Sequence, residues 1–176
     1  MTDADLAIRP STPADTPALE ALYAAAFPDE DLVPQMRALL DEPSGVISLV
    51  AEQGGVVAGH VAFTQCRVEG LDTPAALLGP LCAAPDRQGR GVGSALVKAG
   101  FERLRADGVT TVLVLGDPAY YGRFGFAAGH DIAAPYDLPA EYVAGWQAVS
   151  LDPAKPLPQG RLEVPPVWRV EALWLP

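Results

Sequence analysis

The fold of this chain is decided by the stretch AALLGPLCAAPDRQGRGVGSALVKAGFERLRADGVTTVLVL, residues 75–115. Its apolar first part, residues 75–83, predicts a strand, and residues 85–93 form a glycine-rich loop. Apolar side chains then recur at helical spacing up to about Asp107. Residues 109–115 are an almost continuous apolar run, which is typical of a strand buried on both faces. Together these segments predict one strand–loop–helix–strand unit.

Shorter elements are predicted on both sides of this unit. The expected strands cover residues 6–9, 46–52, 56–68, a segment that begins at Phe126, 147–151 and 168–174, and the expected helices cover 12–27, 31–40 and 117–121. Gly54-Gly55 predicts a hairpin turn. Eight of the 18 prolines fall in the last 42 residues, which indicates turns and extended edges rather than a second domain. We therefore predict a single domain over residues 1–176.

The charge of the chain excludes several classes of partner. Its 176 residues carry 12 basic and 22 acidic side chains, a formal net charge of −10. Such a surface repels the phosphates of nucleic acids and of anionic membranes, so neither is an expected partner. No apolar run approaches the ~18 residues that a membrane span needs. The acidic start Met1-Thr2-Asp3-Ala4-Asp5 does not resemble a signal peptide, so we expect a cytoplasmic protein of bacterial type.

Cys66 and Cys82 are the only cysteines, and both lie in strand-like apolar segments. This placement predicts two buried free thiols rather than a disulfide or a pair of metal ligands. We therefore expect no metal in this chain.

The glycine-rich loop indicates a phosphate site. A loop of this kind can direct several backbone N–H groups to one point, and the following helix adds the positive end of its dipole. The local charge agrees, because residues 87–105 contain five basic side chains and only one acidic one, Glu102. The basic minority of an acidic chain is thus concentrated around this loop.

Three phosphate-binding patterns can be compared with the loop. A P-loop requires Gly-Lys-Ser/Thr, and no lysine precedes Ser94. A dinucleotide fingerprint requires a third glycine, which is absent, although Asp117 lies where a ribose-binding acid would be expected, so this alternative stays open. The pattern Gln/Arg-x-x-Gly-x-Gly/Ala is matched by Gln88, Gly91 and Gly93. A plain tight turn also remains open, but three glycines in five residues cost more backbone entropy than a turn requires.

Two motifs in this order resemble a known family. Residues 78–96 resemble the acyl-CoA-binding motif of the GNAT superfamily of N-acetyltransferases, and residues 121–126 resemble its Tyr-x-x-x-Gly-Phe signature. The resemblance is strong over about 46–130, weaker for 6–45 and weakest in the Pro-rich extension, about 131–176.

The resemblance implies an α/β (α+β) fold: a mixed, curved, mostly antiparallel sheet with helices on both faces and splayed central strands. It also implies an acetyl-CoA-dependent N-acetyltransferase that moves an acetyl group to a primary amine by direct attack in a ternary complex. Pantetheine would pair with the backbone of Leu81, Cys82 and Ala83. The pyrophosphate would rest on backbone amides of Gln88, Gly89, Arg90, Gly91, Val92, Gly93 and Ser94.

Tyr121 takes the position of the residue that, in this family, commonly protonates the departing CoA thiolate; packing without proton transfer is the alternative. The general base is not evident. Residues 75–83 carry no carboxylate, and the family's asparagine in the strand before the tyrosine is also missing. His60 could reach the cleft or have a structural role. A structural role is the interpretation for His130, and Asp117 is interpreted as a helix cap. A chain of waters could serve as the base.

We expect a small-molecule or peptide amine of unspecified identity as the acceptor. Three consecutive acids at residues 29–31 would attract a cationic amine, or they belong to an ordinary solvated loop. Trp146, Trp168 and Trp174 would cover the acceptor cleft, form a contact in a homodimer, or fill the core. A catalytically silent acyl-CoA-binding module is the second functional hypothesis, because the expected strand carboxylate is missing.

Overall fold

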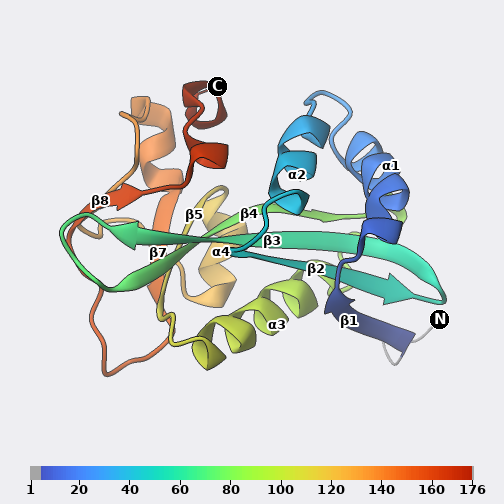
Figure 1. Cartoon of the computed structure of the whole chain (residues 1–176), viewed down its shortest axis with the longest axis horizontal. Coiled ribbons are helices and arrows are strands. Elements are labelled where there is room, and N and C mark those ends of the chain that lie inside the picture. The colour runs from blue at the N-terminus through green and yellow to red at the C-terminus, as the bar shows by residue number, and fades with distance from the viewer. Residues whose placement is uncertain (1–4, 176) are drawn as a thin grey trace. The chain divides into compact units, whose positions relative to one another are not determined.

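The computed structural model describes residues 5–175, and the acidic start of the chain, residues 1–4, lies outside them. The described strands follow the order β1-β2-β3-β4-β5-β7 in one sheet, with β8 paired to β3 and β6 (Figure 1). The strands are β1 Leu6–Pro10, β2 Val46–Gln53, β3 Val56–Val68, β4 Pro74–Ala83, β5 Thr111–Leu115, β6 Ile132–Ala133, β7 Trp146–Ser150 and β8 Gly160–Glu163.

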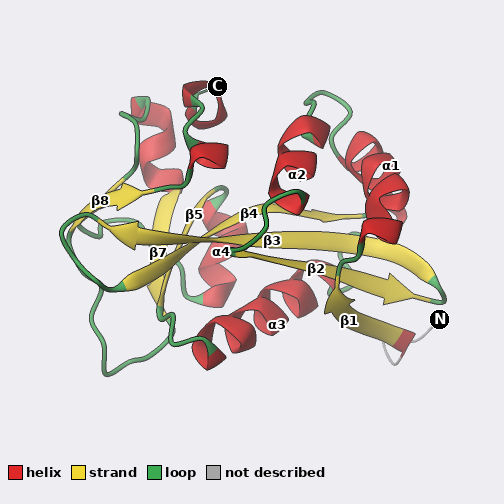
Figure 2. Ribbon diagram, in the orientation of Figure 1, coloured by secondary structure: helices red, strands yellow, loops and turns green. Residues whose placement is uncertain are grey.

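Four α-helices accompany these strands in the described part of the chain: α1 Thr16–Ala26, α2 Val33–Leu40, α3 Val92–Ala106 and α4 Pro118–Tyr121. Strand pairing is antiparallel for β1–β2, β3–β8 and β5–β7, and parallel for β4–β5 and β6–β8. The mixed, mostly antiparallel sheet with helices confirms the predicted fold class. Figure 2 shows the helices in red and the strands in yellow, with α3 between β4 and β5 in the strand–loop–helix–strand unit.

Most helices and strands that were predicted from turn residues, capping residues and apolar spacing are present in the structure. Strand β3 is joined to β2 by the predicted hairpin, in which Gly54 and Gly55 have positive φ angles of 59° and 76°. Helix α4 begins as predicted, since the side chain of Asp117 accepts a hydrogen bond from the backbone N–H of Ala119 at 2.9 Å. The positions of these elements follow from turn and capping residues that act within a few residues of themselves.

Two predicted strands are wrong. No strand begins at Phe126; Ala127 only forms an isolated bridge with Ala148. Residues 168–174 form parts of two 3-10 turns, η6 Pro166–Trp168 and η7 Glu171–Trp174. Apolar residues alternate in this segment, but its backbone forms tight turns, in which Leu173 N–H donates to the Val170 carbonyl at 2.9 Å. The remaining 3-10 turns are η2 Pro13–Asp15, η3 Pro85–Arg87, η4 Gly122–Phe124 and η5 Ala140–Gly145. The short strands β6 and β8 were not predicted.

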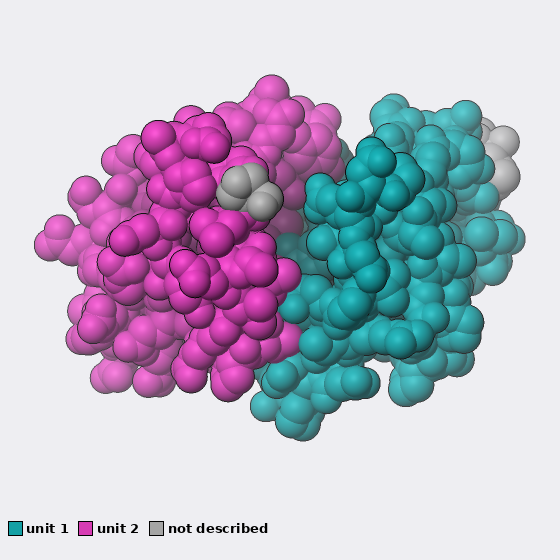
Figure 3. All heavy atoms as spheres, turned by 90° about the horizontal axis from the view of Figure 1, so that it is seen from above, with its two compact units in different colours: residues 1–63, 79–103 teal, residues 64–78, 104–176 magenta. Residues whose placement is uncertain are grey.

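The chain divides into two compact units (Figure 3). Unit 1 contains residues 1–63 and 79–103, and unit 2 contains residues 64–78 and 104–176. In unit 1, α1 and α2 lie on one side of the strands and α3 lies on the other (Figure 1). Helix α3 packs closely on β3 because Gly100 has no side chain: a Cβ atom there would lie 2.9 Å from Cδ2 of Phe63.

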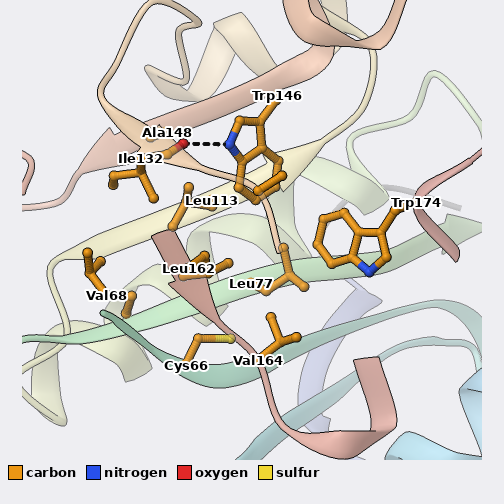
Figure 4. Packing of buried hydrophobic residues seen from close by; sticks show 12 residues of the cluster. Cys66, Val68, Leu77, Leu113, Ile132, Trp146, Ala148, Leu162, Val164 and Trp174 are labelled. Carbon is orange, nitrogen blue, oxygen red and sulfur yellow. Dashed lines mark hydrogen bonds between the residues drawn. The ribbon is translucent and has the colours of Figure 1, made fainter. Parts of the chain in front are cut away.

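The core of unit 2 contains the aromatic residues of the C-terminal region. Trp146 is 7% exposed and Trp174 is 2% exposed, and both pack with apolar residues of β3, β4, β5 and β8 (Figure 4). Each indole N–H has an acceptor: Trp146 donates to the Ile132 carbonyl at 2.8 Å, and Trp174 donates to the Trp168 carbonyl at 3.0 Å. Trp168 donates to Thr64 Oγ1 at 2.9 Å. Of the uses open to these tryptophans, filling the core is the one that the structure shows for Trp146 and Trp174.

Cys66 and Cys82 are both free and buried. Within residues 5–175, no group of three or more His, Cys, Asp or Glu side chains could hold a metal ion. None of the helices in that range is long and apolar enough to cross a membrane.

Arg9 on β1 joins three segments by hydrogen-bonded ion pairs. Its Nη1 and Nη2 atoms each donate to one carboxylate oxygen of Asp15 at 2.8 Å, and Nε donates to Glu52 on β2 at 2.9 Å. The backbone N–H of Thr12 donates to Asp15 at 2.7 Å. These bonds, above all those from Arg9, hold the pKa of the buried Asp15 carboxyl at about 2, below its ordinary 3.8.

We expect Asp15 to make stability depend on pH in acid. Because its pKa is lower in the folded than in the unfolded chain, its stabilisation is complete above about pH 4 and is lost as the pH falls to about 2. The shift corresponds to about 2 kcal/mol of unfolding free energy. Urea unfolding across this pH range should show the loss in the wild type and not in Asp15→Asn. The exposed Asp72 supplies the control Asp72→Asn, and an Asp15→Asn chain with wild-type pH dependence would contradict the assignment.

Candidate active site

The glycine-rich loop connects β4 to α3 in unit 1. Gly89 and Gly91 have φ angles of 73° and 83°, in the left-handed region that favours glycine. A Cβ atom at either residue would meet no atom within 4 Å. The loop therefore borders open space at the two positions where a side chain is missing, and a bound group could approach the backbone closely there.

The N-terminal end of α3 lies at the same loop. Ala95 N–H donates to the carbonyl of Gly91 at 3.0 Å, in the bonding pattern of the first helical turn. The first four N–H groups of an α-helix have no acceptor within the helix, and they lie at the positive end of its dipole. Val92 is buried and anchors this end, whereas Gly93 and Ser94 are half-buried and Gln88, Gly89, Arg90 and Gly91 are exposed. This arrangement suits a phosphate group.

Two side chains beside the loop form hydrogen bonds with neighbouring strands. Arg87 Nη1 donates to Oε1 of Gln53 at 2.9 Å and to the Gln53 carbonyl at 3.4 Å, which connects the loop to the β2–β3 hairpin. The side-chain amide of Gln88 donates to the carbonyl of Ala83 at 3.4 Å. From the sequence, Arg87 contributes only local positive charge; its hydrogen bonds to Gln53 depend on a residue 34 positions away.

The end of β4 carries the other residues predicted to bind the cofactor. The parallel register between β4 and β5 covers Ala75 to Leu78, and β4 continues to Ala83. Leu81 and Ala83 are half-buried, and Cys82 is 5% exposed. The structure thus brings Leu81–Ala83 and the glycine-rich loop together as consecutive parts of unit 1, and this part of β4 lies beyond its register with β5.

Gly59 on β3 was missed in the sequence analysis. A Cβ atom at this residue would lie 2.7 Å from Cγ1 of Val92 and 2.9 Å from the carbonyl oxygen of Cys82. The missing side chain therefore lets β3 approach both the start of α3 and the end of β4. A glycine inside a strand often marks such a close approach, so the sequence did contain a signal for it.

Tyr121 lies in unit 2, at the end of α4. Its ring meets Phe126 edge-on, with centroids 5.8 Å apart, and Tyr120 edge-on at 5.0 Å. Gly116 leaves room for this ring, because a Cβ atom at Gly116 would lie 2.9 Å from Cδ2 of Tyr121. Burial raises the pKa of the Tyr121 hydroxyl above its ordinary value of 10, so it is protonated at neutral pH.

Gly116, which lies against the Tyr121 ring, is held by residues that were not predicted to belong to the site. Gly116 N–H donates to the carbonyl of Gly145 at 2.9 Å. The buried side chain of Gln147 donates to the carbonyls of Gly116 and Gly145, at 3.2 and 3.3 Å. Asp117 acts as the cap of α4, which is the structural one of its two interpretations.

Neither histidine occupies an open position. His60 is fully buried, with Nδ1 2.6 Å from the hydroxyl of Tyr23 and Nε2 2.8 Å from Oγ of Ser48. Burial lowers the pKa of His60 to about 4, so the ring is neutral at pH 7. His130 Nδ1 accepts a hydrogen bond from the N–H of Ile132 at 3.1 Å, and Nε2 lies 3.0 Å from the Trp146 carbonyl. Both rings have structural partners on each nitrogen.

The three acids between α1 and α2 are exposed. Asp31 accepts a hydrogen bond from the backbone N–H of Val33 at 3.3 Å, at the start of α2. Asp29 and Glu30 precede it on the same loop. The segment is therefore accessible to a cation, and one of its acids also serves the helix.

Comparison with known proteins agrees with both motifs. Residues 7–129 match the family model described as an acetyltransferase (GNAT) domain. The chain is 40% identical to the uncharacterized N-acetyltransferase YjhQ of Escherichia coli K12 over 130 residues, 70% of each protein. The structure of the GNAT family N-acetyltransferase YhbS from Escherichia coli in complex with CoA gives a TM-score of 0.84 with 28% identity, over 94% of this chain and 93% of that one.

A second solved structure has the same fold. A GNAT family acetyltransferase from Brucella melitensis in complex with acetyl-CoA gives a TM-score of 0.75 with 30% identity, over 93% of this chain and 97% of that one. The family match covers well over half of the chain and includes the glycine-rich loop and the Tyr121 motif. The resemblance found in the sequence is therefore confirmed, and the chain is an acyltransferase that belongs to the GNAT family of N-acetyltransferases.

Proposed function

We propose that this protein transfers an acetyl group from acetyl-CoA to a primary amine by direct attack in a ternary complex. The glycine-rich loop carries the proposal: its backbone borders open space at Gly89 and Gly91, at the N-terminal end of a 15-residue helix. That space fits a phosphate group, which a Cβ atom at either position would exclude. The CoA and acetyl-CoA complexes of YhbS and of the Brucella protein support the same cosubstrate.

The proposed cofactor contacts use the backbone more than side chains. The amides of residues 88–94 would hold the pyrophosphate, and the backbone of Leu81, Cys82 and Ala83 would pair with pantetheine as an added strand. The end of β4 beyond its register with β5 supports the second part, because a strand needs unpaired backbone groups to accept a new partner. Backbone contacts also explain how a chain of net charge −10 can bind an anionic cofactor.

The transfer forms one C–N bond and breaks the C–S bond of the thioester. The neutral amine supplies the electron pair, and the sulfur leaves as a thiolate. A backbone N–H of Cys82 or Ala83 would donate to the developing oxyanion. The amine proton passes to water, because β4 carries no carboxylate and both histidines are hydrogen-bonded within their units.

Tyr121 would donate from its hydroxyl to the departing sulfur. Its raised pKa keeps the proton on the phenol oxygen, so the hydroxyl acts first as a hydrogen-bond donor to the thiolate. Complete proton transfer to sulfur is less favourable than from a solvated phenol. The neighbouring Tyr120 has a different setting, with the guanidinium of Arg123 4.4 Å from its ring centroid.

The acceptor would be a small-molecule or peptide amine, and the exposed acids at residues 29–31 support a cationic one. A homodimer and a cytoplasmic location remain predictions. A catalytically silent acyl-CoA-binding module is the alternative function, and the observation that favours it is the missing carboxylate on β4.

The two functions differ in a direct assay. Isothermal titration with CoA should show one site per chain, and acetyl-CoA should release free thiol when an amine is present in a panel of diamines, amino sugars and peptides. Binding together with amine-dependent thiol release would support the acetyltransferase. Binding without release from any amine favours the silent module, and absence of CoA binding would contradict both functions.

A further inference from the structure

A row of polar side chains crosses the core of unit 1. It starts at Tyr23 on α1, which belongs to one buried cluster with Cys82 of β4. The Tyr23 hydroxyl lies 2.6 Å from Nδ1 of His60, and His60 Nε2 lies 2.8 Å from Oγ of Ser48 on β2. Ser48 Oγ lies 2.7 Å from Oγ of Ser11, which follows β1. We call these four residues, Tyr23, His60, Ser48 and Ser11, the polar row.

The part of the polar row formed by Tyr23 and His60 lies among apolar side chains, and Ser48 and Ser11 are half-buried. Tyr23 is 1% exposed and His60 is fully buried, and the Tyr23 side chain belongs to a cluster that contains Leu19, Met36 and Val50. Burying a hydroxyl or an imidazole costs free energy unless each polar atom has a partner. Over residues 5–175, no buried side-chain nitrogen or oxygen lacks one. A buried network in which every polar atom is hydrogen-bonded restricts its side chains to one arrangement. The row therefore fixes the positions of the elements that carry these side chains.

Tyr23, at one end of the row, packs in the same buried cluster as Cys82, one of the residues proposed to bind pantetheine. The register with β5 ends at Leu78, so Cys82 lies in the part of β4 beyond it. Next to Cys82, the backbone N–H of Ala84 donates to the carbonyl of Ala58 on β3 at 2.8 Å. Cys82 also packs in the buried cluster that contains Tyr23, which lies on a different element, α1. Strand β4 is thus held from β3 and from α1 at this point.

We propose that Tyr23 and His60 are positioning residues that hold Cys82, and with it the backbone of residues 81–83, in the geometry required for acyl transfer. The inference rests on the proposed function, in which this backbone pairs with pantetheine and donates to the oxyanion. A misplacement of about 1 Å can cost about 100-fold in rate. The row acts by orienting side chains through hydrogen bonds and not through charge, because the low pKa of His60 leaves its ring uncharged at neutral pH.

The test compares two substitutions that each remove one hydrogen bond between side chains. Tyr23→Phe removes the hydroxyl in the row, and Thr64→Val removes the acceptor of the Trp168 indole N–H in unit 2. In hydrogen exchange of the free protein, Tyr23→Phe should speed exchange of the amides of residues 81–84 about tenfold, and Thr64→Val should leave them unchanged. Equal exchange at these amides in Tyr23→Phe and the wild type would overturn the proposal, as would the same acceleration in Thr64→Val.

Kinetics supply a second measurement. Tyr23→Phe should lower kcat about tenfold and change the Kd for CoA less than about threefold, since the glycine-rich loop supplies most of the affinity. His60→Gln should retain activity within about threefold of the wild type, because its amide can accept from Tyr23 and donate to Ser48. A weaker Kd with unchanged kcat in Tyr23→Phe would contradict the positioning role. Exchange needs no ligand, so the proposal can fail there while wild-type CoA binding separately supports the proposed function.

Discussion

Replacement of Gly91 by valine should abolish CoA binding in a chain that still folds. The loop amide at this residue borders open space, and a valine side chain would occupy the volume that a phosphate group needs to reach the backbone. Hydrogen bonds to a charged group contribute about 1.5–3 kcal/mol each, so losing two of them weakens binding at least about 100-fold. Isothermal titration with CoA measures this loss directly.

The control must share the backbone strain of that substitution. Gly91 has a φ angle of 83°, where a residue with a side chain is strained by about 1–2 kcal/mol. Gly70, in the turn between β3 and β4, has a φ angle of 77° and also has no atom within 4 Å of a Cβ position. Gly70→Val should therefore lose similar stability and retain CoA binding. Equal CoA affinity in the two variants would contradict a phosphate site at Gly91.

Replacement of Tyr121 by phenylalanine should lower turnover about 100-fold with little change in CoA affinity. The substitution removes only the hydroxyl that is proposed to donate to the leaving sulfur, and a positioned proton donor contributes about 100-fold or more. The ring would keep its edge-on contact with Phe126 and its place beside Gly116. Thiol release under saturating acetyl-CoA and amine, together with titration of CoA, separates the two effects.

Tyr120→Phe is the matched control, because Tyr120 is the adjacent, half-buried tyrosine of the same helix. Its hydroxyl has no part in the proposed transfer, so turnover should stay near the wild-type value. The raised pKa of Tyr121 also predicts that wild-type activity is not lost by ionisation of this group below about pH 10. Unchanged turnover in Tyr121→Phe, or an equal loss in Tyr120→Phe, would remove Tyr121 from the proposed mechanism.

The limits of sequence reasoning are clearest in the C-terminal region. Apolar residues at 168–174 resemble a strand, but the chain forms parts of two 3-10 turns there, and the indole N–H of Trp168 donates to Thr64 of β3. Strand β8 has only four residues and pairs with Arg67 and Val68 of β3, nearly a hundred positions earlier in the chain. The Trp168–Thr64 hydrogen bond and the pairing of β8 with β3 have no local signal, because each joins residues from distant parts of the sequence.

The strand–loop–helix–strand unit, the glycine-rich loop and the Tyr121 motif were determined by the sequence alone. Turn glycines, helix caps and apolar periodicity act over a few residues, so they are visible without the fold. Only the tertiary structure decided what surrounds them. It placed Gly59 against Cys82, Gly116 under the ring of Tyr121, and His60 between Tyr23 and Ser48. These contacts join residues that come together only when strand register and helix packing are set, because a buried hydrogen bond requires both partners within about 3 Å.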